Sequence, residues 1–94
     1  MINDSFIERL EEAHEFPGLY TLKVIGEQTD SFVATVLAAL QGELQLSDAP
    51  EHTLKATPNG RHVSVTVELT VQSAQQVGSV YTRLQSMPEI RFLM

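Results

Sequence analysis

The segment TPNGRHVSVTVELTV, residues Thr57 to Val71, decides the fold of this chain. It opens with turn-forming residues and continues with a strict alternation of polar and apolar side chains, the pattern of a β-strand with one buried face. Asn59-Gly60 is the preferred central pair of a type I′ hairpin turn. The strand Val63 to Val71 should therefore pair with a short, weakly apolar strand at residues 52–57.

The alternation tests this hairpin, because the correct register must collect apolar residues on one face. With the turn at these two residues, Thr57 lies opposite His62 and the pairing continues along both strands. Leu54 and Ala56 then share a face with the apolar residues of the long strand. The other face carries Lys55, Thr57 and the polar row His62, Ser64, Thr66, Glu68 and Thr70. Turn chemistry and alternation agree.

The N-terminal residues 1–16 are acidic and predict a short amphipathic helix. Ser5 and Glu8 have the spacing of a capping box, and apolar residues follow at helical intervals until Pro17 ends the segment. The acidic side chains are better explained as the solvated face of this helix than as a docking arm.

A second helix is expected from about residue 30 to residue 41, with an apolar stripe along one side. Thr29 and Asp30 are the candidates for its N-cap, and Gly42 is the stop signal. The strand LYTLKVIG at 19–26 precedes it. Its even-numbered residues from Tyr20 to Val24 form one face, and the odd-numbered residues form the other.

After the long strand, Ser73 and Gln76 have capping-box spacing at the start of a third helix. The chain then ends in EIRFLM, residues 89–94, which predicts a last strand. Strict alternation would place Ile90, Phe92 and Met94 on one side of this strand, and Arg91 and Leu93 on the other.

Apart from the N-terminal helix, the order is strand, helix, strand, strand, helix, strand. This predicts an α+β fold, the ferredoxin-like βαββαβ two-layer sandwich, in one domain over residues 1–94 with 1–16 as an acidic helical extension. Right-handed crossovers would put both helices on one face of a four-stranded antiparallel sheet of order 4-1-3-2. The other face stays open. Its expected members are Thr21, Lys23, Ile25, Lys55, Thr57, the polar row, Arg91 and Leu93.

Composition excludes several classes of function. Twelve acidic residues against six basic ones give a net charge of -6, which disfavours nucleic acid as a partner. No apolar run reaches the ~20 residues of a membrane span, and the N-terminus lacks the basic and apolar regions of a signal peptide. With no cysteine, the chain has no disulfide and no thiolate site. We expect a cytoplasmic protein that binds neither membranes nor nucleic acid.

The sequence contains no catalytic or metal-binding constellation. His52 and His62 fall on opposite faces of the predicted hairpin, so one metal ion cannot bind both within one chain. Ser64 lies two residues beyond His62 on the same strand, roughly 6 to 7 Å away, which is too far for direct proton abstraction. We therefore expect no enzymatic activity, no metal and no cofactor.

Several stretches resemble a known family. FPGLYTLKVIG (16–26), LKATPNGRHVSVTVELTV (54–71), QQVGSVYTRL (75–84) and the final IRFLM are similar to the YbeD-like family of small bacterial proteins of unknown function. The resemblance covers about residues 16–94. It implies a ferredoxin-like fold and likeness to ACT-type regulatory domains, which bind small effectors at oligomer interfaces. It implies no catalytic residues.

These observations favour a non-catalytic regulatory or protein-interaction module, ACT-like, that contacts another copy of itself, another protein or a small-molecule effector. The candidate ligand-binding residues are Lys23, Gly26, His62, Ser64 and Arg91. Two alternatives stay open, namely a small enzyme that uses open-face residues around His62, and a purely structural partner subunit.

Overall fold

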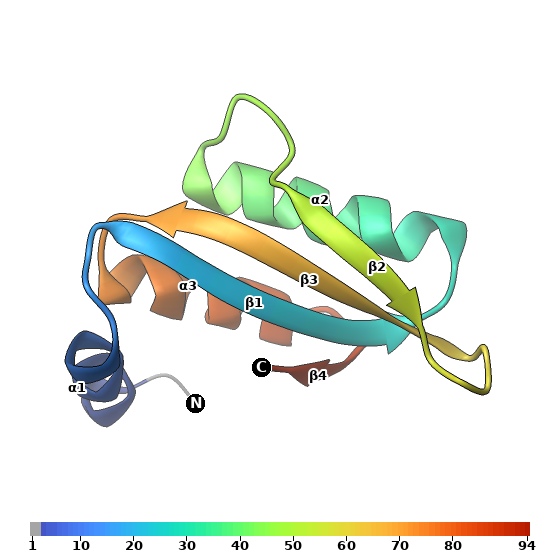
Figure 1. Ribbon diagram of the computed structural model, residues 1–94, viewed down its shortest axis with the longest axis horizontal. Helices are drawn as coiled ribbons and strands as arrows, with labels where there is room; N and C mark the ends of the chain where they lie inside the picture. The colour runs from blue at the N-terminus through green and yellow to red at the C-terminus, as the bar shows by residue number, and fades with distance from the viewer. Residues whose placement is uncertain (1–2) are drawn as a thin grey trace.

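A computed structural model describes residues 3–94 of the chain (Figure 1). Three helices and four strands follow one another along this part of the sequence. They are α1 (Asp4–Ala13), β1 (Gly18–Glu27), α2 (Asp30–Leu44), β2 (His52–Ala56), β3 (His62–Val71), α3 (Ala74–Gln85) and β4 (Ile90–Leu93). None of the described helices is long and apolar enough to span a membrane.

The four strands form one antiparallel sheet in the order β2-β3-β1-β4, which is the predicted order read from the other edge. The central strands β1 and β3 pair over their full length, from Gly18 opposite Val71 to Glu27 opposite His62. Helices α2 and α3 lie on the same side of the sheet, and α1 lies at one end of it (Figure 1). The opposite face of the sheet is open, as predicted.

The core lies between the sheet and its two helices. Every second residue of β3 from Val63 to Val71 is buried, as the alternation in the sequence requires. Leu22 and Val24 of β1 lie beside them at 0% exposure, and Tyr20 packs against the core as a partly buried neighbour. The helices contribute Phe32, Val36, Ala39, Leu40 and Leu44 from α2, and Ala74, Val77, Val80, Tyr81 and Leu84 from α3.

The hairpin has the predicted register, but its turn is not type I′. Ala56 pairs with Val63, and the Thr57 amide donates to the carbonyl of His62 at 3.0 Å. The turn is closed instead by the Gly60 amide, which donates to the carbonyl of Thr57 at 2.9 Å. Among the residues of the turn, only Gly60 has a positive φ, of 72°. The reason is Pro58, because it has no N–H for the closing pair of a two-residue hairpin and suits the first central position of a type I turn.

Helix α2 differs from the prediction at its C-terminus. It continues through Gly42 to Leu44 and ends at Gln45, which takes a left-handed conformation with φ 54°. The additional turn buries Leu44 in the core, and this burial outweighs the cost of about 1 kcal/mol for glycine within a helix. At the N-terminus the cap is Thr29, whose hydroxyl accepts the Phe32 amide at 3.2 Å.

Helix α1 forms, although not with the predicted cap. The side chain of Asn3, and not Ser5, accepts the Phe6 amide at 3.0 Å. Leu10 joins the core, and the Phe6 ring meets the Tyr81 ring edge-on with centroids 5.4 Å apart. The predicted helical extension thus packs against α3.

Strand β4 departs from strict alternation. A register shift in its pairing with β1 lets Phe92 lie opposite Ile25 while Ile90 lies opposite Gly26, so Arg91 is the extra residue of a β-bulge. Leu93 consequently lies opposite the buried Val24 and packs on the core, and Phe92 lies on the open face with 65% exposure. Met94, which pairs with Lys23, also lies on the open face, so the predicted grouping of Phe92 and Met94 with Ile90 on the buried side was wrong, as was the predicted open-face position of Leu93.

Candidate functional site

The strand register sets out the open face as rows of side chains that cross the sheet. One row contains Lys55, Ser64, Ile25 and Phe92, in the order β2, β3, β1, β4. The next row contains Thr53, Thr66 and Lys23, with Met94 beside Lys23 through two backbone hydrogen bonds of 2.9 Å. Apolar side chains thus gather on the β1 and β4 side of this face, and polar side chains on the β2 and β3 side.

A hollow of about 470 Å³ opens on this face between the hairpin and β4. Ile25 and Phe92 supply its apolar lining, and the polar lining comes from the hairpin and the bulge. The complete lining is Ile25, Thr57, Asn59, His62, Arg91 and Phe92. We call these six residues the open-face site. Its lining combines apolar contact area with a few polar groups, as small-molecule sites commonly do.

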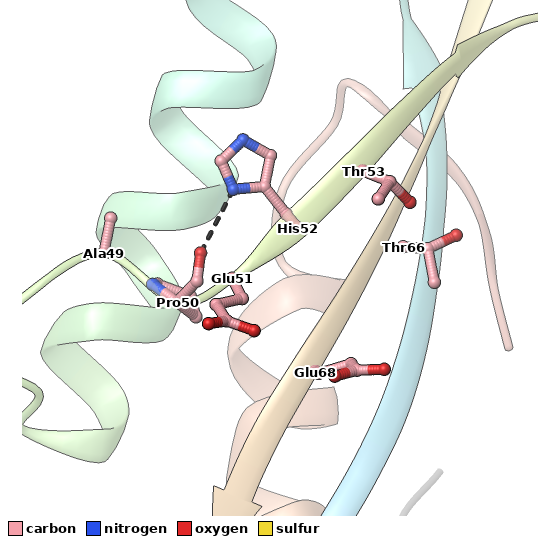
Figure 2. A pocket seen from close by; sticks show the side chains of 7 residues that line it. All are labelled: Ala49, Pro50, Glu51, His52, Thr53, Thr66 and Glu68. Atoms are coloured by element: carbon pink, nitrogen blue, oxygen red, sulfur yellow. Dashed lines mark hydrogen bonds between the residues drawn. The ribbon is translucent and has the colours of Figure 1, made fainter.

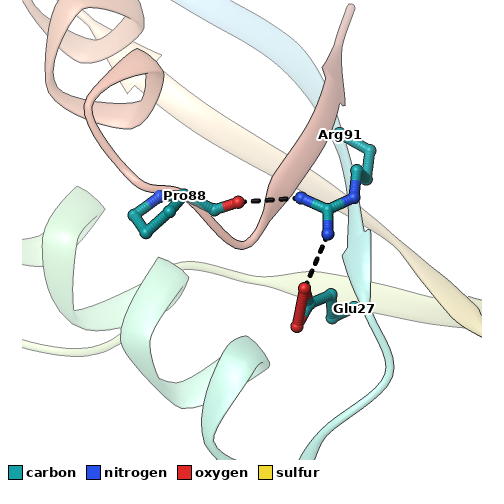
Figure 3. Close-up of polar contacts among 3 residues, drawn as sticks. All are labelled: Glu27, Pro88 and Arg91. Atoms are coloured by element: carbon teal, nitrogen blue, oxygen red, sulfur yellow. Dashed lines mark hydrogen bonds and ion pairs between the residues drawn. The ribbon is translucent and has the colours of Figure 1, made fainter.

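The bulge orients the cation of this site. Arg91 donates from Nη2 to Oε1 of Glu27 at 2.7 Å and from Nη1 to the carbonyl of Pro88 at 2.8 Å (Figure 3). The Arg91 and Glu27 side chains are 44% and 43% exposed. Water therefore reaches the ion pair, and such a pair contributes at most about 1 kcal/mol to stability. Its main consequence is that the guanidinium group is held in place at the edge of the hollow.

The hairpin presents hydrogen-bond donors on the other side of the hollow. Oδ1 of Asn59 accepts the Thr57 hydroxyl and the Arg61 amide, both at 3.0 Å. The oxygen of this side chain is therefore engaged within the turn, whereas its amide nitrogen has no hydrogen-bond partner among the side chains and backbone groups that the structure describes. The half-buried His62 adjoins it and brings an imidazole to the same hollow.

The structure brings four of the five predicted ligand-binding residues to one surface. His62 and Arg91 line the hollow, Ser64 lies opposite Ile25, and Lys23 lies two residues before Ile25 on the same face. Gly26 is separate from them. It is buried on the helix side of the sheet, where a Cβ atom would meet the ring of Phe32. Gly26 is thus placed for packing and lies away from the open face.

Phe92 and Asn59 belong to the site but were missed as site residues at the sequence level. Strict alternation predicts a buried Phe92, and no residue near Arg91 signals the bulge that turns it outward. Asn59 was interpreted only as a turn residue. Pro58 favours a type I turn closed at Gly60, and in such a turn the Asn59 side chain is a structural acceptor.

A second hollow, of about 530 Å³, lies at the edge strand β2 (Figure 2). Its titratable residues are Glu51, His52 and Glu68, and Nδ1 of His52 lies 3.1 Å from the carbonyl of Pro50. Three such residues could suggest a metal site. However, among the side chains that the structure describes, no group of three or more from His, Asp and Glu is arranged to hold a metal ion.

A third hollow, of about 620 Å³, runs over the outer side of the helices, where Ile7 of α1 meets the outer face of α3 around Gly78 and Arg83. Most of the residues that line it are polar. The open-face site differs from both other hollows because it combines a fixed cation with large apolar side chains.

The comparison with protein families matches residues 11–94 to a family described as "Protein of unknown function (DUF493)". The chain belongs to this family. Bacterial proteins named UPF0250 protein are similar over most of their length. The relative from Shewanella piezotolerans is 32% identical over 83 residues, which cover 88% of this chain and 92% of the relative. The relative from Shewanella oneidensis is 31% identical over 97% of both chains. The relative from Chromobacterium violaceum is 29% identical over 89% of this chain and 94% of its own.

These matches bear out the resemblance to small bacterial proteins of unknown function. Neither the family description nor the names of these relatives give an activity. The family match leaves out most of α1, which spans residues 4–13.

Proposed function

We propose that the chain is a non-catalytic regulatory module with a ferredoxin-like, ACT-like fold, which binds a small effector on its open sheet face at an interface between copies of itself. One observation carries the proposal. Lys23, His62, Ser64 and Arg91 surround the apolar Ile25 and Phe92 on a face that neither α2 nor α3 covers. Such a surface is suited to binding a small molecule. In our proposal the protein is a sensor in the cytoplasm.

The oligomeric part of the proposal is supported by the apolar side chains of β4. Phe92 and the adjoining Met94 are 65% and 59% exposed. Large apolar side chains that gather on one surface are typical of interaction sites, whereas single ones are ordinary. A second copy placed over this face would bury them and would enclose the hollow beside Arg91.

A catalytic role has less support. In the described residues, the His62 imidazole has no side-chain hydrogen bond that would orient it as a general base. Ser64 carries the hydroxyl that is nearest to His62 along β3, and it lies two residues further on, opposite Ile25. An enzyme using His62 would lose turnover in His62→Ala with its fold intact.

The experiment that tests the proposal combines mass in solution with a ligand screen. We expect an oligomeric mass by light scattering, and a rise of the melting temperature with particular metabolites. A ligand present at a hundred times its Kd stabilises the folded chain by about 2.7 kcal/mol. Ser64→Ala should reduce the rise, whereas Ser79→Ala, on the exposed face of α3, should not. A monomer whose melting point responds to no compound would refute the proposal. A stable oligomer with no response would favour a purely structural subunit.

A further inference from the structure

The open-face site has a chemistry that selects one class of ligand. We propose, on the basis of the function proposed above, that it binds an anion with a flat apolar body, such as an aryl carboxylate, and that Glu27 is the partner that this anion displaces from Arg91. The apolar body would lie against Ile25 and Phe92, and the anion would face Arg91, Asn59 and His62.

The size and apolar part of the site support a ligand of one or two rings. The hollow of about 470 Å³ lies within the roughly 300 to 1,000 Å³ typical of small-molecule sites. Phe92 leaves 65% of its surface exposed, so burial against a ligand would remove apolar area from water. An aromatic ring can also stack on the Phe92 ring or meet it edge-on.

The polar groups around the hollow are mainly donors. A guanidinium group has five N–H donors, and Arg91 uses two of its nitrogens, one on Glu27 and one on Pro88. The amide nitrogen of Asn59 is a further donor, since its oxygen is engaged by Thr57 and Arg61. Converging donors with few competing acceptors fit the oxygens of an anion.

The contact between Arg91 and Glu27 is of a kind that an anion can replace. It uses one carboxylate oxygen and one guanidinium nitrogen, at 2.7 Å. A carboxylate on a ligand could instead bind the guanidinium edge through two parallel hydrogen bonds, which is the stronger geometry. Pro88 would keep Arg91 in place during the exchange, because its carbonyl holds the other terminal nitrogen.

The charges around the site are more favourable to an anion than the net charge of the whole chain is. The chain carries twelve acidic residues against six basic ones. Near the hollow, by contrast, the cations Lys23, Lys55 and Arg91 are accompanied by one carboxylate, that of Glu27, because Glu51 and Glu68 line the separate hollow at β2. Lys55 lies in the same row as Ile25 and Phe92, and Lys23 in the next, so both lie beside the hollow.

The test uses 2-naphthoate as the probe, with neutral 2-naphthamide and acetate as matched compounds, in titration calorimetry on the full chain. We expect 2-naphthoate to bind more tightly than both. Arg91→Gln should weaken its binding about tenfold or more, because a hydrogen bond to a charged group is lost. Glu27→Gln should tighten it. Arg83→Gln, at the end of α3 away from the hollow, is the control and should change nothing. Amide NMR shifts caused by the probe should centre on Ile25, His62 and Phe92.

Equal binding of 2-naphthoate to Arg91→Gln and to the unaltered chain would overturn the inference, as would shifts centred on the helices or no binding at all. The two proposals fail separately. If a neutral or cationic metabolite stabilises the chain and shifts the same amide signals, the effector-binding function is supported and the preference of the site for an anion is refuted. Binding of 2-naphthoate to a permanent monomer would support the anion site and refute the oligomeric interface.

Discussion

The ring of Phe32, on α2, packs directly over the backbone of Gly26, on β1. A Cβ atom at position 26 would overlap this ring and would lie 2.7 Å from the carbonyl oxygen of Glu89. Gly26 therefore allows the start of α2 and the loop before β4 to approach the sheet on the same side, directly behind the open-face site.

We expect Gly26→Ala to lower the free energy of unfolding by about 3 kcal/mol, the upper end for overpacking, because both the ring and the backbone of Glu89 would have to move. Urea denaturation would measure the change. Gly42→Ala is the control, since nothing lies within 4 Å of an added Cβ there, and it should stabilise the chain by about 1 kcal/mol. Equal stability of Gly26→Ala and the unaltered chain would contradict this packing.

The bulge at Arg91 predicts opposite behaviour for two adjacent residues of β4. Leu93→Ser should destabilise the fold by roughly 1 to 3 kcal/mol, because Leu93 packs on the core. Phe92→Ser should change the unfolding free energy of dilute, dissociated protein by less than about 0.5 kcal/mol, since its side chain is exposed. Strict alternation without the bulge requires the reverse order, which denaturation of the two variants would reveal.

The hydroxyl groups of Tyr20 and Tyr81 lie 3.0 Å apart beneath α1, and burial, with this hydrogen bond, raises the pKa of Tyr81 far above its ordinary value. The unfolded chain loses the Tyr81 proton near pH 10, where the folded chain keeps it. The contribution of protonated Tyr81 to the free energy of unfolding is therefore fully present below pH 10. It decreases as the pH rises above 10, by at most about 1.4 kcal/mol per pH unit for one proton. Tyr81→Phe should show a smaller fall between pH 9 and 11 in urea titrations. Parallel curves for the two proteins would argue against a buried, protonated Tyr81.

The turn of the hairpin predicts a specific pattern at position 60. Gly60 has a φ of 72°, so Gly60→Ala should cost about 1 to 2 kcal/mol through its left-handed conformation. Gly60→Asn should cost less, because asparagine adopts this conformation more readily. Thermal unfolding of both variants would check the order, and an alanine variant as stable as the asparagine variant would be inconsistent with the turn described.

Much of the fold was predictable because its signals are local and repeated. Alternation from Val63 to Val71 identified the central strand, and the same pattern in the preceding segment identified the register of the hairpin, which the structure confirms. The Ser73 cap of α3 was also correct, since its hydroxyl accepts the Gln76 amide at 3.2 Å. Each of these features depends on backbone chemistry and side-chain periodicity within a few residues.

Other features depend on contacts between distant parts of the chain. Helix α2 passes Gly42 because Leu44 packs in the core. The turn type, by contrast, has a local cause, the missing N–H of Pro58. Periodicity alone places the candidate residues other than Gly26 on the open face, and Lys23, His62 and Ser64 do lie there. Periodicity does not predict that Phe92 joins them on this face, because its position depends on the pairing of β4 with β1.

Periodicity along the chain thus determined the strands, the helices and the sheet order, because hydrogen bonding and burial of alternate side chains act over short distances. The pairing of β4 with β1 decided the composition of the site. The single bulged residue, Arg91, turns Phe92 outward and Leu93 inward, and it brings the guanidinium group to Glu27, which is 64 residues away in sequence. A bulge is a property of two paired strands, and the sequence of neither strand predicts it.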